Sequence, residues 1–181
     1  MAPGDRIETR VDSAGRLPVC RRRRPDGFWL DDLAEGLTFR IGAYEVTAAE
    51  VKDFATRYDP QPFHLDEDAA GDTLFDGLAA SGRHTAAITM RLLTSAFPIA
   101  AGVIGSAIHL EWPSPTRPGD DLRLEISVGT IAHSTSRPGR GSVTLTYDTI
   151  NQHGEVWQRT TGRVIAWQRP AAESAAATGG K

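Results

Sequence analysis

The sequence predicts an α+β domain in which a curved antiparallel sheet wraps around one long helix. The helix is predicted at residues 78–97, an Ala-rich segment without acidic residues whose polar positions fall on one narrow arc, so it should be buried nearly all round. Later in the chain the apolar period becomes two, which is typical of strands with one buried face. A buried helix and one-sided strands together favour a two-layer packing.

The composition fits one folded domain. The chain has 181 residues, of which 40% are hydrophobic and 24% charged, enough for a core of its own. Its net charge of −3 argues against a general nucleic-acid-binding surface. There is no apolar run of transmembrane length, no N-terminal signal core, and one cysteine, Cys20, which cannot form an intrachain disulfide. A cytoplasmic protein without a membrane partner is therefore expected.

Both ends of the chain are predicted to lie outside the folded domain. Residues 1–28 are rich in Arg, Gly, Pro and Asp without helical or strand period, and residues 170–181 are mainly Ala, Ser, Thr and Gly. The basic run at 21–24 fits a solvated tail, and contact with the phosphates of a ligand is the alternative. We expect a flexible N-terminal extension, a domain at 29–169 and a disordered C-terminal tail.

The domain is predicted to open with a strand at 38–46 and a short amphipathic helix. Thr47 and Glu50 form a capping box at the start of this helix, which carries the chain to Tyr58. Two prolines then fix their own φ angles, so residues 58–66 are expected to run as a stiff, extended loop. Asp66 has the character of an N-cap for a further short helix.

Four strands are predicted after the long helix. Residues 103–112 supply the first, and alternating apolar positions mark the next two at 122–128 and 143–147. A hairpin turn at 151–154 joins the third of these strands to the last, at 156–167.

Asp59 and His64 are the strongest candidates for chemistry. A carboxylate and an imidazole five residues apart on a stiff loop can reach one small volume and contact a single water, as acid/base catalysis requires. Alternatively, Asp59 ends the preceding helix and His64 is an ordinary half-buried loop histidine. No second ligand cluster of recognisable spacing supports a metal site around His64 and Asp66, so neither a metal nor a cofactor is expected.

Three stretches of the sequence resemble the MaoC-like dehydratase family, which includes the (R)-specific enoyl-CoA hydratases. They are Asp59-Pro60-Gln61-Pro62-Phe63-His64-Leu65-Asp66, Ala80-Ser81-Gly82 and Trp112-Pro113-Ser114-Pro115-Thr116-Arg117-Pro118-Gly119-Asp120. The likeness covers roughly residues 33–167 and implies a single hotdog fold. Asp59 and His64 stand at the two catalytic positions of the family motif D-x-N-P-x-H, and Gln61 replaces its Asn while keeping an amide.

The resemblance implies a hydro-lyase acting on an acyl thioester of CoA or of acyl carrier protein. Hydration of an α,β-unsaturated thioester needs a base to activate water at C3 and an acid to protonate C2, tasks that Asp59 and His64 would share. The backbone N–H of Gly82, at a helix N-terminus, is the candidate for the enolate oxygen, and a role in helix packing is its alternative. Further substrate-binding residues are expected at Gln61, Pro62, Phe63, Ser81 and His84.

Two functions of other classes remain open at this stage. One is a hotdog acyl-CoA thioesterase, although such enzymes often use a carboxylate on the central helix and residues 78–97 contain none. The other is a non-catalytic acyl-thioester-binding module, against which the presence of both Asp59 and His64 counts. An open sheet edge predicts association, so we expect a homodimer or a higher homo-oligomer.

Overall fold

The computed structural model describes residues 27–97 and 99–170. Its centre is an antiparallel sheet of five strands in the order β1-β3-β4-β5-β2. The strands are β1 (Thr38–Glu45), β2 (Ile104–Glu111), β3 (Asp121–His133), β4 (Arg140–Ile150) and β5 (Val156–Trp167). Most of the predicted extension and tail, including Cys20 and the basic run at 21–24, lies outside the described residues.

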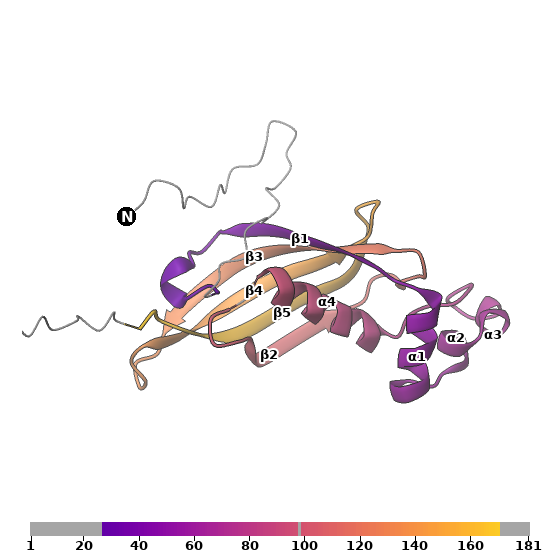
Figure 1. Cartoon of the computed structure of the whole chain (residues 1–181), viewed down its shortest axis with the longest axis horizontal. Helices are drawn as coiled ribbons and strands as arrows, with labels where there is room; N and C mark the ends of the chain where they lie inside the picture. Colours follow the sequence, from indigo (N-terminus) through magenta and orange to yellow (C-terminus); the bar gives the residue numbers. More distant parts are fainter. Residues whose placement is uncertain (1–26, 98, 171–181) are drawn as a thin grey trace, which may run out of the picture.

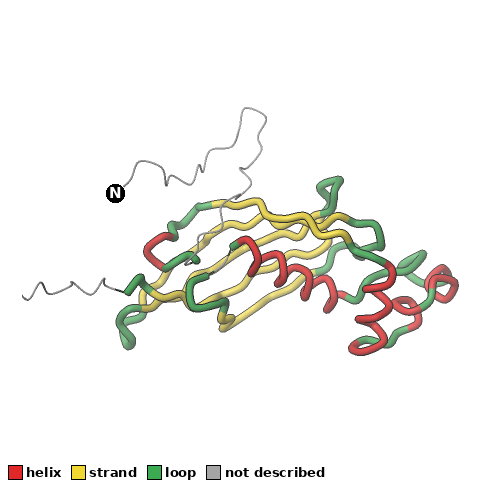
Figure 2. Tube along the Cα trace, viewed as in Figure 1, coloured by secondary structure: helices red, strands yellow, loops and turns green. Residues whose placement is uncertain are grey.

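In the described part of the chain, four α-helices accompany the sheet, preceded by the short 3-10 helix η1 (Leu30–Asp32). They are α1 (Ala48–Tyr58), α2 (Pro62–Leu65), α3 (Glu67–Gly71) and α4 (Gly82–Ala96). The long helix α4 lies along one face of the sheet, while α1, α2 and α3 gather beyond one end of it (Figures 1 and 2). The α+β architecture of a sheet around a central helix is thereby confirmed.

Strand patterning explains the core. Along β4 and residues 121–128 of β3, buried side chains alternate with more exposed ones, because one face of the sheet packs under α4. The turn after β4 is closed at Gly154, whose φ of 83° is readily adopted by glycine. At the end of α4, the rings of Phe28, Phe39 and Phe97 pack with centroids 4.7–5.6 Å apart. Because Phe28 is buried there, the folded domain includes at least this residue of the predicted extension.

Two predictions about helices near the site are wrong. The long helix begins at Gly82 and not at Leu78, since Ser81 caps it and residues 78–81 approach it in irregular conformation. Residues 78–80 are nevertheless buried, which explains their apolar character without a helix. The proline-rich loop is extended at Gln61, but Pro62 opens the helical turn α2, because a fixed φ near −65° and a missing N–H suit the first position of a helix.

Tyr58 and β2 are more exposed than the sequence patterns suggest. Val51, Ala55 and Tyr58 follow one another at helical spacing in α1, but only Val51 and Ala55 are buried, whereas Tyr58 is 71% exposed. In β2, seven of the eight residues are exposed, and Leu110 is half-buried. No helix within residues 27–97 and 99–170 is both long and apolar enough to cross a bilayer.

Candidate active site

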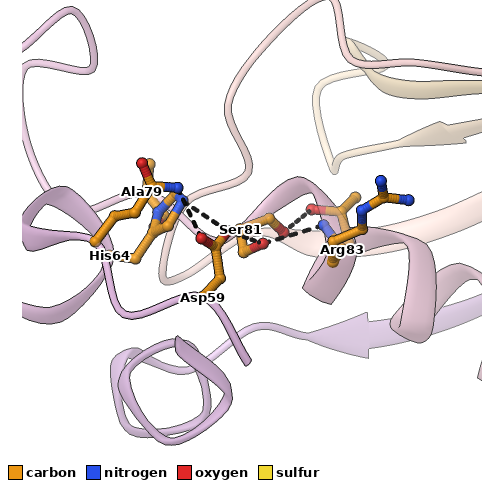
Figure 3. A network of polar contacts seen from close by, with 7 residues as sticks. Asp59, His64, Ala79, Ser81 and Arg83 are labelled. Atoms are coloured by element: carbon orange, nitrogen blue, oxygen red, sulfur yellow. Dashed lines mark hydrogen bonds and ion pairs between the residues drawn. The ribbon is translucent and has the colours of Figure 1, made fainter. Parts of the chain in front are cut away.

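Asp59 and His64 meet where α1 ends and α2 begins. Asp59 is the C-cap of α1, and the extended Gln61 lets Pro62 start α2, which carries His64 as its third residue. This tight reversal places His64 Nε2 3.5 Å from Asp59 Oδ2 (Figure 3). The predicted convergence of the two side chains is therefore present, although a helical turn produces it instead of a fully extended loop.

His64 is held by a main-chain oxygen. The side chain is buried, and its Nδ1 lies 2.7 Å from the carbonyl oxygen of Ala79. A carbonyl can only accept a hydrogen bond, so Nδ1 is assigned the proton, and Nε2 of the neutral ring is left with its lone pair towards Asp59. The ring of Phe63 packs edge-on against the imidazole, with centroids 4.6 Å apart. His64 thus has one tautomer and one orientation in which Nε2 can exchange a proton.

Asp59 is held by two side chains, one at each carboxylate oxygen. The Ser81 hydroxyl donates to Oδ2 at 2.6 Å, and the Gln61 amide donates to Oδ1 at 2.7 Å. The Ser81 hydrogen bond is the main cause that lowers the pKa of Asp59, and burial opposes it. The Gln61 hydrogen bond, the charge of Arg83 and, when its ring is protonated, the charge of His64 lower this pKa further. Asp59 is therefore an oriented carboxylate at neutral pH, and the amide at Gln61 does reach it.

The separation of the two groups suits a shared water. When Asp59 is ionised and the His64 ring is uncharged, an Asp59 oxygen and His64 Nε2 are both hydrogen-bond acceptors. Their distance of 3.5 Å is also too long for a direct hydrogen bond of ordinary strength. A water molecule beside them can donate one hydrogen to each acceptor. Its oxygen lone pairs then face away from the pair, which is the orientation that a nucleophile requires.

Gly82 has the packing role considered for it, and it lies at the start of a helix as expected. It is the first residue of α4, where a backbone N–H has no acceptor within the helix. A Cβ on Gly82 would lie 2.9–3.3 Å from three atoms of the Trp112 ring, so a glycine is needed for this contact. Trp112 is fixed in turn, since its Nε1 donates to Gln158 Oε1 at 2.9 Å. The close packing accounts for the glycine, and the free N–H is a separate property of the same residue.

Ser81 and His84 are both engaged with the protein. Besides donating to Asp59, the Ser81 hydroxyl accepts from the N–H of Arg83 and so caps α4. His84 stacks on Phe54 of α1, with centroids 4.7 Å apart and an 8° angle between the rings. Burial lowers the pKa of His84, against the opposing charge of Glu50. Its buried Nδ1 has no hydrogen-bond partner within the described residues.

Three contributors to the site were missed from the sequence. The Ala79 carbonyl gives no signal, because any residue type can supply a main-chain acceptor. Arg83 was given no role, yet its charge lowers the pKa of Asp59, and its guanidinium lies 5.8 Å from the centre of the Trp112 ring. Trp112 was quoted within a motif but given no contact with Gly82. In residues 27–97 and 99–170, no three His, Cys, Asp or Glu side chains are grouped as metal ligands.

Comparisons with known proteins show what this chain is similar to. A family model described as "MaoC like domain" matches residues 36–151. The uncharacterized protein YdeM of Bacillus subtilis (strain 168) is 30% identical over an alignment of 130 residues that covers 68% of this chain and 87% of that protein. A solved structure of a MaoC-like dehydratase from Rhodospirillum rubrum is 55% identical, with a TM-score of 0.78 over 80% of this chain and 100% of that chain. An (R)-hydratase of A. caviae involved in PHA biosynthesis is 28% identical, with a TM-score of 0.59 over 76% and 98% of the two chains.

Proposed function

The chain belongs to the MaoC-like domain family and is a hydro-lyase, and from this premise we propose that it is an (R)-specific enoyl-CoA hydratase. It would add water to the double bond of an α,β-unsaturated acyl thioester, or remove water from the 3-hydroxyacyl thioester. The observation that carries the proposal is the pair of acceptors at Asp59 and His64, each fixed by its own hydrogen bonds and 3.5 Å apart. The (R) configuration is supported by the similarity to the A. caviae (R)-hydratase.

In the proposed reaction, Asp59 and His64 act as one acid/base unit. The pair takes one proton from the bound water while the water oxygen bonds to C3, and it returns one proton to C2. The second water hydrogen stays on the new hydroxyl group, so the charge of the pair is unchanged after one turnover. His64 exchanges its proton at Nε2, because Nδ1 is committed to the Ala79 carbonyl. Only acid/base groups are used, and the proposal therefore includes no metal or cofactor.

Negative charge on the thioester oxygen is assigned to the start of α4. As water adds to C3, electrons move to the carbonyl oxygen and an enolate develops. The N–H of Gly82 stands at the positive end of a helix of 15 residues, next to the Ser81 that binds Asp59. A donor fixed in advance at this place stabilises the developing charge without reorganisation.

Hydration of a short trans-2-enoyl-CoA tests the function. Loss of the conjugated double bond should be seen by ultraviolet absorbance, and chiral analysis should identify the (R)-3-hydroxyacyl product. A thiol reagent in a parallel reaction detects thioester cleavage, the outcome that would replace hydratase by thioesterase. Binding without either reaction would indicate a non-catalytic module. An acyl carrier protein thioester of equal chain length shows which carrier is preferred.

Assembly through β2 is part of the proposal. Among the described residues, β2 is an edge strand, and three of the exposed large apolar side chains, Ile104, Ile108 and Trp112, lie on it or directly after it. Pairing of two β2 edges about a two-fold axis would satisfy the open hydrogen-bonding row and cover these side chains. Since Trp112 packs on Gly82, a partner subunit at β2 would stand next to the site.

Sedimentation and activity measured together test the assembly. Ile108→Lys should shift the chain towards monomer, because a charge replaces a side chain that is 60% exposed in the single chain. Ala43→Lys is the matched control, an exposed residue of the opposite edge strand β1. On dilution, specific activity should fall with the dimer fraction. A fully active monomer would exclude a site that depends on the partner.

A further inference from the structure

The chain that joins α3 to α4 carries the supports of both proposed catalytic side chains. Ala79 supplies the carbonyl for His64, and Ser81 supplies the hydroxyl for Asp59. Yet residues 72–81 form neither helix nor strand, and two of them, Asp76 and Gly77, have positive φ angles of 49° and 123°. Such a segment does not hold its own shape through a regular hydrogen-bond ladder, so its position must be determined by contacts with other parts of the chain.

Arg117 supplies several of these contacts. Its Nη1 donates to the carbonyl oxygens of Gly77 at 2.7 Å and of Leu78 at 3.2 Å, and its Nη2 donates to the carbonyl of Phe75. Within the described residues the guanidinium makes no ion pair with a carboxylate. Its charge is thus directed at three main-chain oxygens of one short segment, immediately before Ala79. Hydrogen bonds from a charged donor are about twice as strong as neutral ones.

The neighbouring Thr116 fixes the rest of the segment. Its carbonyl accepts from the N–H of Ala80 at 2.9 Å, and its Oγ1 accepts from Thr85 Oγ1 of α4 at the same distance. The three hydrogen bonds from the Arg117 guanidinium and the one to the Thr116 carbonyl therefore reach main-chain atoms on both sides of Ala79. This leaves the Ala79 carbonyl little freedom to turn away from His64 Nδ1.

The backbone of Arg117 is anchored at the end of the sheet where β3 and β5 begin. Its backbone N–H donates to Asp120 Oδ2 at 2.6 Å, and the same oxygen accepts from Trp157 Nε1 of β5 at 2.7 Å. The main chain of Asp120 and Gly119 is tied to Val46 by two hydrogen bonds of 2.8 Å. Because these anchors use the backbone of Arg117, a change of its side chain leaves them in place.

We infer that Arg117 is a positioning residue for His64, acting through the carbonyls of residues 75–78 on the Ala79 carbonyl. Without the guanidinium, three carbonyl oxygens lose their common donor and the segment before Ala79 relaxes. The Nδ1–H tautomer of His64 then loses the acceptor that selects it, and Nε2 is no longer held with its lone pair towards Asp59. The kinetic consequence rests on the proposed hydratase function, whereas the consequence for the His64 tautomer does not.

Arg117→Gln and Arg117→Lys test the inference, with Arg123→Gln as the matched control because Arg123 pairs with Asp121 on the sheet. In Arg117→Gln, kcat for enoyl-CoA hydration should fall by about tenfold to a hundredfold with KM changed by less than about threefold, as for a misplaced catalytic group. Arg117→Lys should retain an intermediate kcat, because an ammonium keeps the charge but not the fork of donors.

Nitrogen NMR of the histidine rings provides the readout that does not depend on activity. The His64 signals are assigned by their loss in His64→Ala. They should report the Nδ1–H tautomer in the parent and a mixture of tautomers in the Arg117 variants. An unchanged tautomer together with an unchanged kcat would overturn the inference. If Arg117→Gln does not fold, the milder Arg117→Lys decides by the same two measurements. If the parent hydrates no enoyl thioester, the proposed function fails while the tautomer still decides the role of Arg117.

Discussion

The two ends of α4 are held by different kinds of contact. At the Gly82 end the helix packs on Trp112 and is also held by polar contacts: Ser81 caps the helix and binds Asp59, and Thr85 bonds to Thr116. At the Ala96 end they are apolar, since Leu93 and Phe97 are fully buried and the Phe97 ring packs against two other phenylalanines. One helix thus joins the proposed active site to the aromatic core; in Figure 1, α4 runs along the sheet from the end where α1, α2 and α3 gather.

This difference separates activity from stability along a single helix. A buried hydrogen bond contributes about 0.5–1.5 kcal/mol net, whereas truncation of a buried aromatic side chain costs about 3–5 kcal/mol. The apolar end therefore fixes the helix on the sheet. The hydrogen bonds at the polar end can then position the side chains of the proposed active site, even though each bond contributes little to the free energy of unfolding. Each prediction below tests whether the two ends divide in this way.

The largest expected effect is on stability, at the apolar end. Phe97→Ala should lower the free energy of unfolding by about 3–5 kcal/mol, because the ring is fully buried and its removal leaves a cavity between Phe28 and Phe39. At a temperature where the variant remains folded, kcat should change little. Urea unfolding and activity measured on the same preparation check both statements. Met90→Ala, on the exposed side of α4, is the control and should cost far less.

The next largest effect is on activity, at the polar end. Asp59→Asn and His64→Ala should each lower kcat by ~10² or more without loss of the fold, and the double variant should be little worse than either. Non-additivity is expected because both side chains act on one water. Asp53→Asn and His153→Ala are matched controls, because Asp53 is an exposed residue of α1 and His153 an exposed residue of the β4–β5 turn. Near-parental hydration by either single variant, with its fold verified, would remove the pair from the mechanism.

Gly82→Ala should lower both the activity and the free energy of unfolding, each by less than the variants above. The added methyl would stand 2.9 Å from the Trp112 ring, and moving the ring would break its bond to Gln158, which is buried. We expect kcat/KM to fall by about tenfold, with a shift in tryptophan fluorescence and a loss of about 1–3 kcal/mol from the unpaired amide. In Gly71→Ala the new Cβ meets no atom within 4 Å, so this control should behave as the parent.

Trp112→Leu shows whether the Gly82 methyl acts through the indole. If it does, Gly82→Ala combined with Trp112→Leu should be less impaired than the sum of the two single changes. Strict additivity of the losses would instead place the effect of the methyl on the helix start itself.

Sequence reasoning found the elements whose pattern is local. Alternating apolar residues mark β3 and β4 because a sheet face packs under α4, and the capping box at Thr47 and Glu50 marks α1 through contacts within four residues. The proximity of Asp59 and His64 could be predicted for the same reason, because they are only five residues apart in the sequence. The start of α4 was misplaced because residues 78–80 are apolar and buried like the helix that follows. Ser81 is a typical N-cap residue and did mark the true start.

Other features depend on long-range contacts that no local pattern contains. Arg117 lies 42 residues from Phe75 and binds main-chain oxygens, so the identity of its partners leaves no trace in the sequence. The exposure of β2 was hidden for a different reason. Its apolar residues are typical of a covered strand, but within one described chain nothing covers them, and their composition suits the proposed subunit contact.

The smallest expected effect is a shift in pH dependence at Ser81. The Ser81 hydroxyl is the main cause that lowers the pKa of Asp59, and Gln61 is a weaker one. The proposed reaction needs the ionised carboxylate, so activity is lost as pH falls through this pKa. In Ser81→Ala the pKa should rise, and the acid limb of kcat/KM should therefore move to higher pH. Gln61→Leu should move the limb in the same direction by less. An acid limb that stays in place in Ser81→Ala would show that it does not report Asp59, and would leave the hydroxyl with its role as helix cap alone.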